Sequence, residues 1–217
     1  MIEIERMLPA TLHRRGSRGA APAFRTLLGE ADWARLAAPI QARFAATTTL
    51  ADFEGEAELE ASFAGRALAQ ILRAVGGPLP WIVGAAAARV TIRKQADGAV
   101  WDRSFRRPGG RWIHVRSLKR VADGRLFECA GPIWMRLRLA AAGSALAFHS
   151  DGFFLALGPV RLRLPGWLTP GALTVLHTDA GEGRFVFALT CDHPLFGWLY
   201  RQTIRLADAP VQGGGHA

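Results

Sequence analysis

Residues 53–61, FEGEAELEA, alternate strictly between small or apolar side chains and glutamates, and this stretch decides the fold class. Successive side chains of a β-strand point to opposite faces, so the pattern predicts a strand with one apolar face and one carboxylate face. A helix would spread the four glutamates around its circumference instead. The inward face of this strand would consist of Phe53, Gly55, Ala57, Leu59 and Ala61.

The pattern changes to helical spacing directly after this strand. The apolar positions of the next segment are Phe63, Ala67, Leu68, Ile71, Leu72 and Val75. They form one stripe of an amphipathic helix over residues 63–75, which Gly76-Gly77-Pro78 ends. Upstream, apolar residues between Phe24 and Phe44 recur at spacings that predict two short helices, interrupted near Gly29 and Pro39.

From Arg89 onward the chain consists of short alternating or apolar runs separated by turn residues. The predicted strands are 89–94, 100–106, 111–119, 126–130, 133–140, 145–157, 160–164, 173–179, 184–192 and 197–206, with a bend near Asp151-Gly152. Strands joined by hairpin-sized turns without helices between them must pair in an antiparallel manner. The sequence therefore predicts an α+β protein: a strongly curved antiparallel sheet or incomplete barrel of about ten strands, wrapping the helix at 63–75.

Length and composition favour one folded domain. The chain has 217 residues, of which 50% are hydrophobic, which is enough to bury a sizeable core and excludes a disordered chain. We expect a flexible basic arm at 1–22, a single α+β domain at 23–208 and a disordered tail at 209–217. The two cysteines, Cys129 and Cys191, have apolar neighbours and are expected to be buried free thiols.

The sequence contains no predicted membrane span and no predicted secretion signal. The longest apolar stretch, residues 76–88, is interrupted by Pro78 and Pro80 and is too short to cross a bilayer. The N-terminus carries Glu3 and Glu5 and lacks the apolar region of a cleaved signal. We therefore expect a soluble, cytoplasmic protein.

The net charge of +9 comes almost entirely from arginine, since only Lys94 and Lys119 are lysines, a preference typical of a high-GC genome. Ten basic residues and three aspartates lie between Arg93 and Arg125, a pattern compatible with a cationic surface for anionic lipid, nucleic acid or a protein partner. A solvated outer face explains the same pattern more simply. No nucleic-acid-binding motif accompanies the charge, so we do not expect nucleic acid as a partner.

Three further strands alternate arginine with apolar residues, at 135–139, 160–164 and 201–206, which places rows of arginine on the outer face of the sheet. The glutamate strand at 54–60 is the natural neighbour of one such row.

No local motif for catalysis or cofactor binding is present. The chain lacks a phosphate-binding loop and a nucleophile elbow, and its six histidines do not follow metal-ligand spacing. We therefore expect no metal and no cofactor.

The best candidates for chemistry are polar residues inside apolar strands. Glu128 lies within Leu126-Phe127-Glu128-Cys129-Ala130, and Arg103 interrupts the strand that carries Trp101 and Phe105. A carboxylate forced into a dry cavity would have a raised pKa and would act as an acid or base, with Arg103 and His193 as convergent partners. The alternative is a carboxylate on the arginine-rich outer face or a partly buried Glu–Arg pair.

The order of several motifs resembles the bacterial family DUF4166, a domain of unknown function. The matching segments are Phe53–Ala57 leading into Gly65–Ala69, Gly77–Pro80, Trp101–Phe105 as W-x-R-x-F, Glu128–Pro132 as E-x-x-G-P, Leu164–Pro170, Phe185–Phe187 and His193–Gly197. The resemblance covers roughly residues 22 to 206. It implies no catalytic residue. The family's domain also occurs behind saccharopine-dehydrogenase-like reductase domains, which implies that any reductase-type partner of this chain would be a separate protein.

Three functional hypotheses follow. The favoured one is a binding module for a small apolar molecule, held in a cavity of a few hundred Å³ between the curved sheet and the helix. Its predicted ligand-binding residues are Trp101, Phe105, Trp112, Phe127, Trp134 and Phe148. The second is a cofactor-independent enzyme that uses Glu128, Arg103 and His193 in the same cavity. The third is a basic surface adaptor that uses the cations of residues 93–125.

Overall fold

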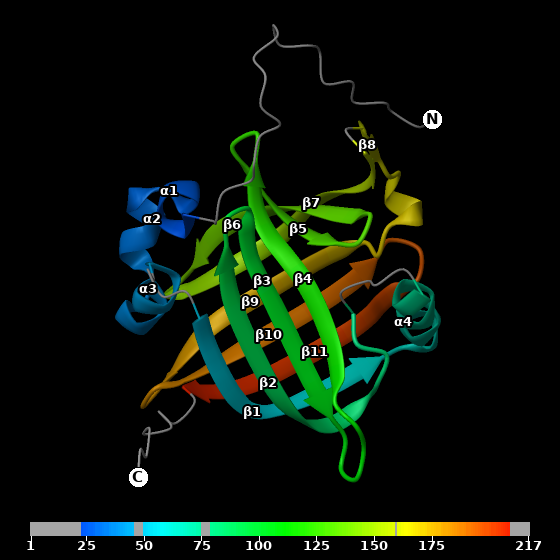
Figure 1. Cartoon of the computed structure of the whole chain (residues 1–217), viewed down its shortest axis with the longest axis horizontal. Coiled ribbons are helices and arrows are strands. Elements are labelled where there is room, and N and C mark those ends of the chain that lie inside the picture. Colours follow the sequence, from blue (N-terminus) through cyan, green and yellow to red (C-terminus); the bar gives the residue numbers. More distant parts are fainter. Residues whose placement is uncertain (1–22, 46–49, 75–78, 159, 209–217) are drawn as a thin grey trace, which may run out of the picture.

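The computed structural model describes residues 23–45, 50–74, 79–158 and 160–208, and Figure 1 shows their arrangement. The helices are α1 (Phe24–Leu28), α2 (Glu30–Arg35), α3 (Ala38–Ala45), α4 (Phe63–Ala74) and the 3-10 turn η1 (Gly166–Leu168). The strands are β1 (Leu50–Ala61), β2 (Gly84–Gln95), β3 (Gly98–Arg106), β4 (Ile113–Ala122), β5 (Arg125–Ala130), β6 (Ile133–Ala142), β7 (Ala145–Leu157), β8 (Val160–Arg163), β9 (Ala172–Gly181), β10 (Arg184–His193) and β11 (Gly197–Asp208).

The strands of the described ranges form one antiparallel sheet in the order β6-β5-β4-β3-β2-β1-β11-β10-β9-β7-β8. A further pairing between β6 and β7 closes ten of these strands into a barrel and leaves β8 outside it. All strands predicted from the sequence are present, and their antiparallel connectivity is confirmed. The expectation of an incomplete barrel is wrong, because β7 bonds to β6 on one side and to β9 on the other.

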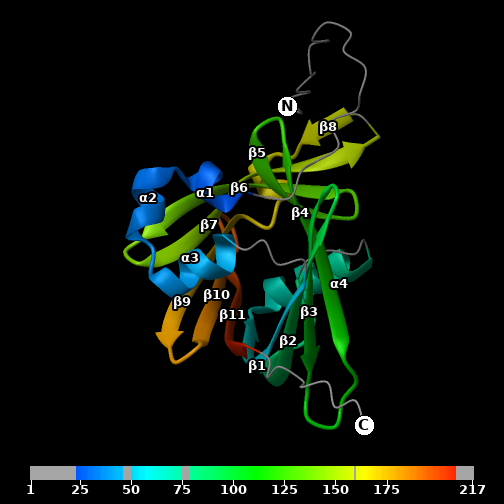
Figure 2. The ribbon, with the colours of Figure 1, turned by 60° about the vertical axis from the view of Figure 1, so that its left-hand side comes forward.

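The predicted bend in β7 separates the barrel from its one outer strand. Residues 146–149 pair with β9, whereas residues 154–157 pair with β8. Gly152 lies between the two halves with a φ of 119°, which favours glycine. Figure 2 shows β8 set apart from the barrel strands as a result.

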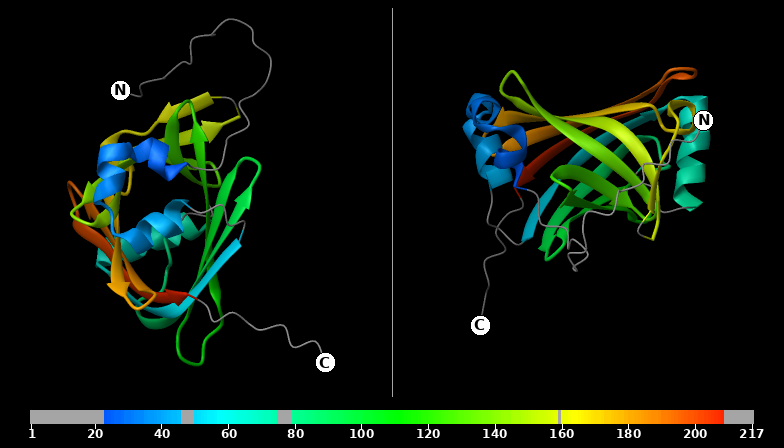
Figure 3. Two further views of the ribbon diagram at one scale, coloured as in Figure 1. Left: turned by 90° about the vertical axis from the view of Figure 1, so that its left-hand side faces the viewer. Right: turned by 90° about the horizontal axis from the view of Figure 1, so that it is seen from above.

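The expectation that the sheet wraps the helix at 63–75 is also wrong. Helix α4 lies at one end of the barrel and packs against β11 and β1, while α1, α2 and α3 lie at the opposite end (Figure 3). Its buried face is formed by Gly65, Ala69 and Leu72, with Leu68 partly buried. Phe63 and Ile71, which the sequence pattern assigns to the buried stripe, point to solvent. The predicted end of this helix at 75–78 lies outside the described residues.

Three short helices replace the two predicted for residues 24–44. The break at Gly29 is confirmed. The second break falls at Leu36 and Ala37, before Pro39, which then occupies the first turn of α3. Proline is well tolerated there because the first-turn N–H groups have no helical partner, so Pro39 starts a helix instead of interrupting one.

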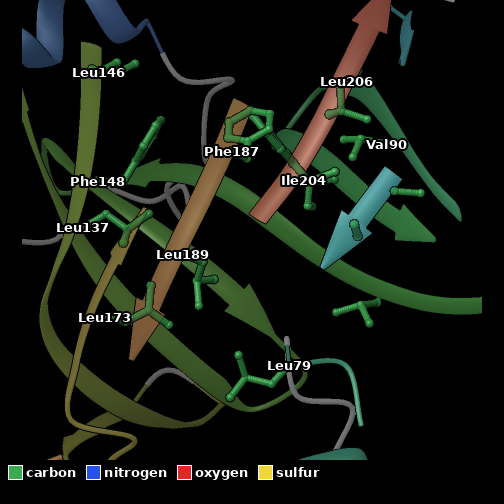
Figure 4. Close-up of a cluster of buried hydrophobic side chains, with 14 of the residues drawn as sticks. Leu79, Val90, Leu137, Leu146, Phe148, Leu173, Phe187, Leu189, Ile204 and Leu206 are labelled. Atoms are coloured by element: carbon green, nitrogen blue, oxygen red, sulfur yellow. The ribbon is translucent and has the colours of Figure 1, made fainter. Parts of the chain in front are cut away.

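The main hydrophobic core fills the barrel and extends to the helices at both ends. Inward-facing side chains alternate along the strands, and the close-up in Figure 4 shows Phe148 of β7, Phe187 and Leu189 of β10, and Ile204 of β11 converging. Trp33 and Ile40 continue this core under α2 and α3. The side chains facing inward therefore determine what the barrel encloses.

The outer face carries the expected pairing of opposite charges. Glu56 and Glu60 of β1 lie opposite Arg205 and Arg201 of β11, which confirms the glutamate strand as the neighbour of an arginine row. On the other side of β1, Glu54 forms an ion pair with Arg89 of β2. Within the described ranges, no helix is both long and apolar enough to cross a membrane. The predicted arm at 1–22 and tail at 209–217 lie outside the described residues.

Candidate functional site

A buried cluster of charged side chains lies inside the barrel, centred on Glu128. The carboxylate of Glu128 accepts hydrogen bonds from Lys119 Nζ at 2.8 Å and from Ser117 Oγ at 2.6 Å. Arg103 Nη2 lies 3.3 Å from the same carboxylate. Two cations therefore surround one anion, and all three side chains are largely shielded from solvent.

The strand register brings these groups together. Lys119 of β4 lies directly opposite Glu128 of β5, and Ser117 is two residues away on the same face of β4. Arg103 faces inward from β3, the next strand, because it shares the inward parity of Trp101 and Phe105. The structure thus brings Glu128 and Arg103 together in the barrel interior.

The charge state of Glu128 is the opposite of the expected one. Burial alone would raise the pKa of its carboxyl group, but Lys119 and Arg103 outweigh burial and lower this pKa to about 2. Burial lowers the pKa of the Lys119 ammonium group, and the adjacent Glu128 carboxylate opposes that shift. Glu128 is therefore an ionised acceptor of three hydrogen bonds or ion pairs at neutral pH, without a proton to donate.

The space beside this cluster is small. The cavity that Arg103, Lys119, Glu128 and Gln202 line holds about 40 Å³. That volume accommodates a few water molecules, since about 10–15 Å³ is needed for one. Two buried polar atoms near it, Trp101 Nε1 and Gln202 Oε1, have no hydrogen-bond partner in the described part of the chain. This cavity suits ordered water rather than an organic ligand.

A larger pocket of about 340 Å³ lies at the end of the barrel that α1 and α3 cover. Its walls are predominantly aromatic and aliphatic. The lining residues are Phe24, Ala42, Arg43, Phe44, Ala51, Phe53, Ile92, Lys94, Ala99, Trp101, His177, Phe185 and Phe187. The volume lies at the lower end of the range for small-molecule sites, about 300–1,000 Å³. We call it the α3-end pocket.

His177 is the central polar group of the α3-end pocket. Its side chain is almost fully buried, and neither ring nitrogen has a hydrogen-bond partner in the described part of the chain. The ring stacks on Phe185 at 4.9 Å and contacts Phe187 and Phe44 edge-on at 4.3 and 5.0 Å between centroids. Burial, with a smaller contribution from nearby Arg43, lowers the pKa of His177 to about 3. The imidazole is therefore neutral and offers one donor and one acceptor.

Two cations also line this pocket. Arg43 of α3 forms an ion pair with Asp179 at 3.4 Å and lies over the ring of Phe185 at 4.2 Å. Lys94 lines the pocket from β2 and is partly exposed. A polar group of a ligand would thus meet neutral His177 and positive charge, within otherwise apolar walls.

The six aromatic residues predicted to bind a ligand divide between the two faces of the sheet. Trp101, Phe105 and Phe148 point into the barrel, and of these Trp101 lines the α3-end pocket. Trp112 lies on the outer face beside Arg89 and Arg106. The remaining two, Phe127 and Trp134, belong to a separate small cluster with Cys129 and Phe154 on the opposite face of β5. The structure does not bring these six residues to one site.

His193, the third candidate for chemistry, lies away from Glu128. It is buried at the end of β10, next to the turn into β11, where its Nδ1 accepts a hydrogen bond from the backbone N–H of Leu195. Its ring contacts Phe196, at 4.8 Å between centroids. This geometry fixes the turn and gives His193 no contact with the charged cluster.

The basic stretch at 93–125 does not form a single surface patch. Arg103 and Lys119 point into the barrel, and several of the outward cations are paired, as Arg116 is with Asp102 at 2.6 Å and Arg120 with Asp97 at 3.9 Å. Elsewhere, Cys129 and Cys191 are buried free thiols as expected. No three His, Cys, Asp or Glu side chains of the described ranges gather where they would hold a metal ion.

The fold and the pocket define a closed antiparallel β-barrel with an apolar site beneath its N-terminal helices. The family model "Domain of unknown function (DUF4166)" matches residues 36–205, so the chain belongs to the DUF4166 family, and the resemblance inferred from its motifs is confirmed. Comparison with curated proteins and with solved structures gives no match.

Proposed function

We propose that this protein is a binding module for a small, predominantly apolar molecule, and that the ligand occupies the α3-end pocket. The observation that carries the proposal is His177, which is buried in the aromatic wall with both ring nitrogens unbonded in the described part of the chain. A buried polar group without a partner costs about 1–3 kcal/mol. A ligand that bonds to the imidazole would recover that cost.

The lining residues indicate the chemical character of the ligand. Phe24, Phe44 and Trp101 offer apolar and aromatic surface, which favours an apolar body. Neutral His177 favours one hydroxyl, carbonyl or carboxyl group on that body, and Lys94 favours a partial or full negative charge on the same group. We therefore expect an apolar molecule with one oxygen-containing polar group.

This site differs from the one that the sequence favours, although the class of function is the same. The sequence pattern places the cavity between the sheet and the helix at 63–75, whereas the α3-end pocket lies at the opposite end of the barrel, beneath α1 and α3. We prefer the binding hypothesis over the enzyme hypothesis for two reasons. The ionised Glu128 carboxylate already accepts hydrogen bonds from Lys119 and Ser117. The free space beside it is also only about 40 Å³.

Titration with the apolar fluorescent dye 1-N-phenylnaphthylamine tests the proposal. We expect saturable binding to the wild-type protein, and Ala42→Trp, which fills the pocket from α3, should weaken the dye's affinity at least tenfold. Ala34→Trp is the matched control, because Ala34 is an exposed alanine on the adjacent helix α2 and does not line the pocket. Equal dye affinity of the wild-type protein and Ala42→Trp would overturn the assignment of the pocket.

A further inference from the structure

One end of the barrel gathers most of the exposed large apolar side chains. Of the ten found on the described part of the chain, seven belong to α4, η1, the turn between β10 and β11, and the start of β11. They are Phe63, Ile71, Trp167, Leu168, Leu195, Phe196 and Trp198. The exposed fractions of Phe63, Leu195 and Phe196 are 90%, 72% and 64%. We call this surface the apolar end.

The three elements of the apolar end adjoin one another. A surface groove is lined by Gly166 of η1 and by Pro194 of the β10–β11 turn. The start of α4 packs on the beginning of β11, directly after this turn, because Ser62 N donates to Leu199 O at 3.1 Å and Gly65 lies directly against Leu199. Figures 1 and 3 place all three elements at the end of the barrel opposite α1–α3.

Exposed aromatic and aliphatic side chains in such number mark an interaction surface. Trp167, Leu195 and Phe196 lie on a 3-10 turn and a hairpin turn, not in the face of a regular element. Tryptophan and phenylalanine with leucine are the residues that enter the headgroup region of a bilayer.

The net charge of the same segments indicates which kind of partner the apolar end binds. Residues 63–74, 163–171 and 192–201 contain four arginines, Arg66, Arg73, Arg163 and Arg201, and one carboxylate, Asp192. Arg201 lies over the ring of Trp198 at 5.4 Å, so positive charge adjoins the aromatic surface, although Glu60 of β1 lies opposite Arg201 and offsets part of that charge. A second copy of the chain would place the net positive charge of these segments against itself in a twofold interface, which is unfavourable. An anionic surface complements both features.

We propose that the apolar end docks on the surface of a membrane containing anionic lipids, with the side chains of η1 and the β10–β11 turn entering the headgroup region. The arginines then lie at the level of the lipid headgroups, where each contributes about a fivefold gain in binding. The α3-end pocket lies at the other end of the barrel and stays accessible to water in this orientation. The inference concerns a separate surface and does not depend on the ligand in that pocket.

Co-sedimentation with lipid vesicles tests the proposal. We expect the full chain to sediment with vesicles of phosphatidylcholine containing about 30% phosphatidylglycerol, to bind pure phosphatidylcholine much less, and to dissociate as salt is raised. The variant Trp167→Ser/Phe196→Ser should lose at least tenfold in partition onto the anionic vesicles. Both side chains are exposed, so the fold should persist, as far-ultraviolet circular dichroism would verify.

Leu50→Ser is the matched control, because Leu50 is an exposed apolar residue at the far end of β1. It should bind the anionic vesicles as the wild-type protein does. Failure of the wild-type chain to sediment with anionic vesicles would overturn the proposal, as would unchanged binding by the double variant. A wild-type dimer in sedimentation velocity that the double variant abolishes would assign the apolar end to a protein interface instead.

Discussion

Lys119 and Glu128 face each other across neighbouring strands inside the barrel, with Lys119 Nζ 2.8 Å from Glu128 Oε2. Arg103 adds a second positive charge 3.3 Å from the other carboxylate oxygen. Charges removed from water are costly unless they are paired, and the carboxylate of Glu128 pairs with both cations of this cluster. The pair is therefore a structural element whose removal can be measured.

Glu128→Gln should destabilise the protein by about 3–5 kcal/mol, because it removes the carboxylate that pairs with Lys119 and Arg103 in the interior. Urea denaturation followed by circular dichroism measures the free energy of unfolding. Glu54→Gln is the matched control, since Glu54 pairs with Arg89 on the exposed outer face, and its loss should cost no more than about 1 kcal/mol.

The double variant Glu128→Gln/Lys119→Met should recover part of the lost stability, because it removes a cation together with the anion. No recovery in the double variant would contradict the assignment of Glu128 as the counter-charge of Lys119.

His177→Phe should raise the free energy of unfolding while it weakens ligand binding. The phenyl ring keeps the contacts with Phe185 and Phe187 and removes a buried polar group that has no partner in the described part of the chain, which is worth about 1–3 kcal/mol. A ligand that bonds to the imidazole loses a hydrogen bond, and the expected loss of affinity is about tenfold. Urea denaturation and a ligand titration on the same preparation measure both effects. A variant that is less stable than the wild-type protein would show that the imidazole has a partner in the folded chain.

The stability should decrease as the pH falls from 6.5 to 4.5, and His177 should account for part of the slope. The pKa of His177 is about 3 in the folded state and 6.5 for an ordinary histidine, so in this window the unfolded chain binds a proton that the folded chain does not. The free energy of unfolding then falls by roughly 1 kcal/mol per pH unit. Glu128, whose pKa is lowered from 4.5 to about 2, contributes a further loss only below pH 4.5.

Urea denaturation at several pH values between 7 and 4.5 measures this slope, and His177→Phe is the comparison. The slope should be shallower in the variant by the contribution of one proton. Identical slopes for the two proteins would mean that His177 titrates normally in the folded state.

Gly65→Ala should weaken the attachment of α4 to the barrel. A Cβ atom at this position would lie 1.8 Å from the carbonyl oxygen of Leu199, so the helix must move. Alanine is a better helix former than glycine by about 1 kcal/mol, but the backbone clash outweighs this gain, and we expect a net loss of about 1–3 kcal/mol. Gly166→Ala is the control, because nothing lies within 4 Å of its Cβ position. Thermal unfolding compares the two variants, and equal stability would mean that α4 does not pack as described.

The sequence pattern predicts the strands well because half-buried strands alternate in period two. The segments from Phe53 to Ala61 and from Arg89 onward show this period with turn residues between them. Closure of the barrel is not visible in the pattern, because it depends on β7 pairing on both of its edges in three dimensions. The face that α4 buries is also not predictable from the pattern, since Phe63 and Ile71 belong to the apolar stripe but point to solvent.

Candidate residues were easier to predict for the charged cluster than for the pocket. Glu128 and Arg103 stand out because each is a charge inside an apolar strand, although the pKa of Glu128 moves opposite to the expectation through its partner Lys119. His177 lacks a comparable signal from spacing, because its neighbours Phe185 and Phe44 come from other elements. A signal was nevertheless present: the inward parity of β9 places His177 on the same face as Leu173 and Val175.

The pairing of β1 with β11 joins the first strand of the barrel to the last, between residues that lie 139 to 155 positions apart in the chain. During synthesis, the backbone groups on the β11 side of β1 therefore stay unpaired until nearly the whole polypeptide has been made. Folding that depends on such a distant contact is slow, and the open edge favours aggregation in the meantime. The glutamates on the outer face of β1 give this strand a high negative charge. That charge opposes association with other chains while the edge of β1 is still unpaired.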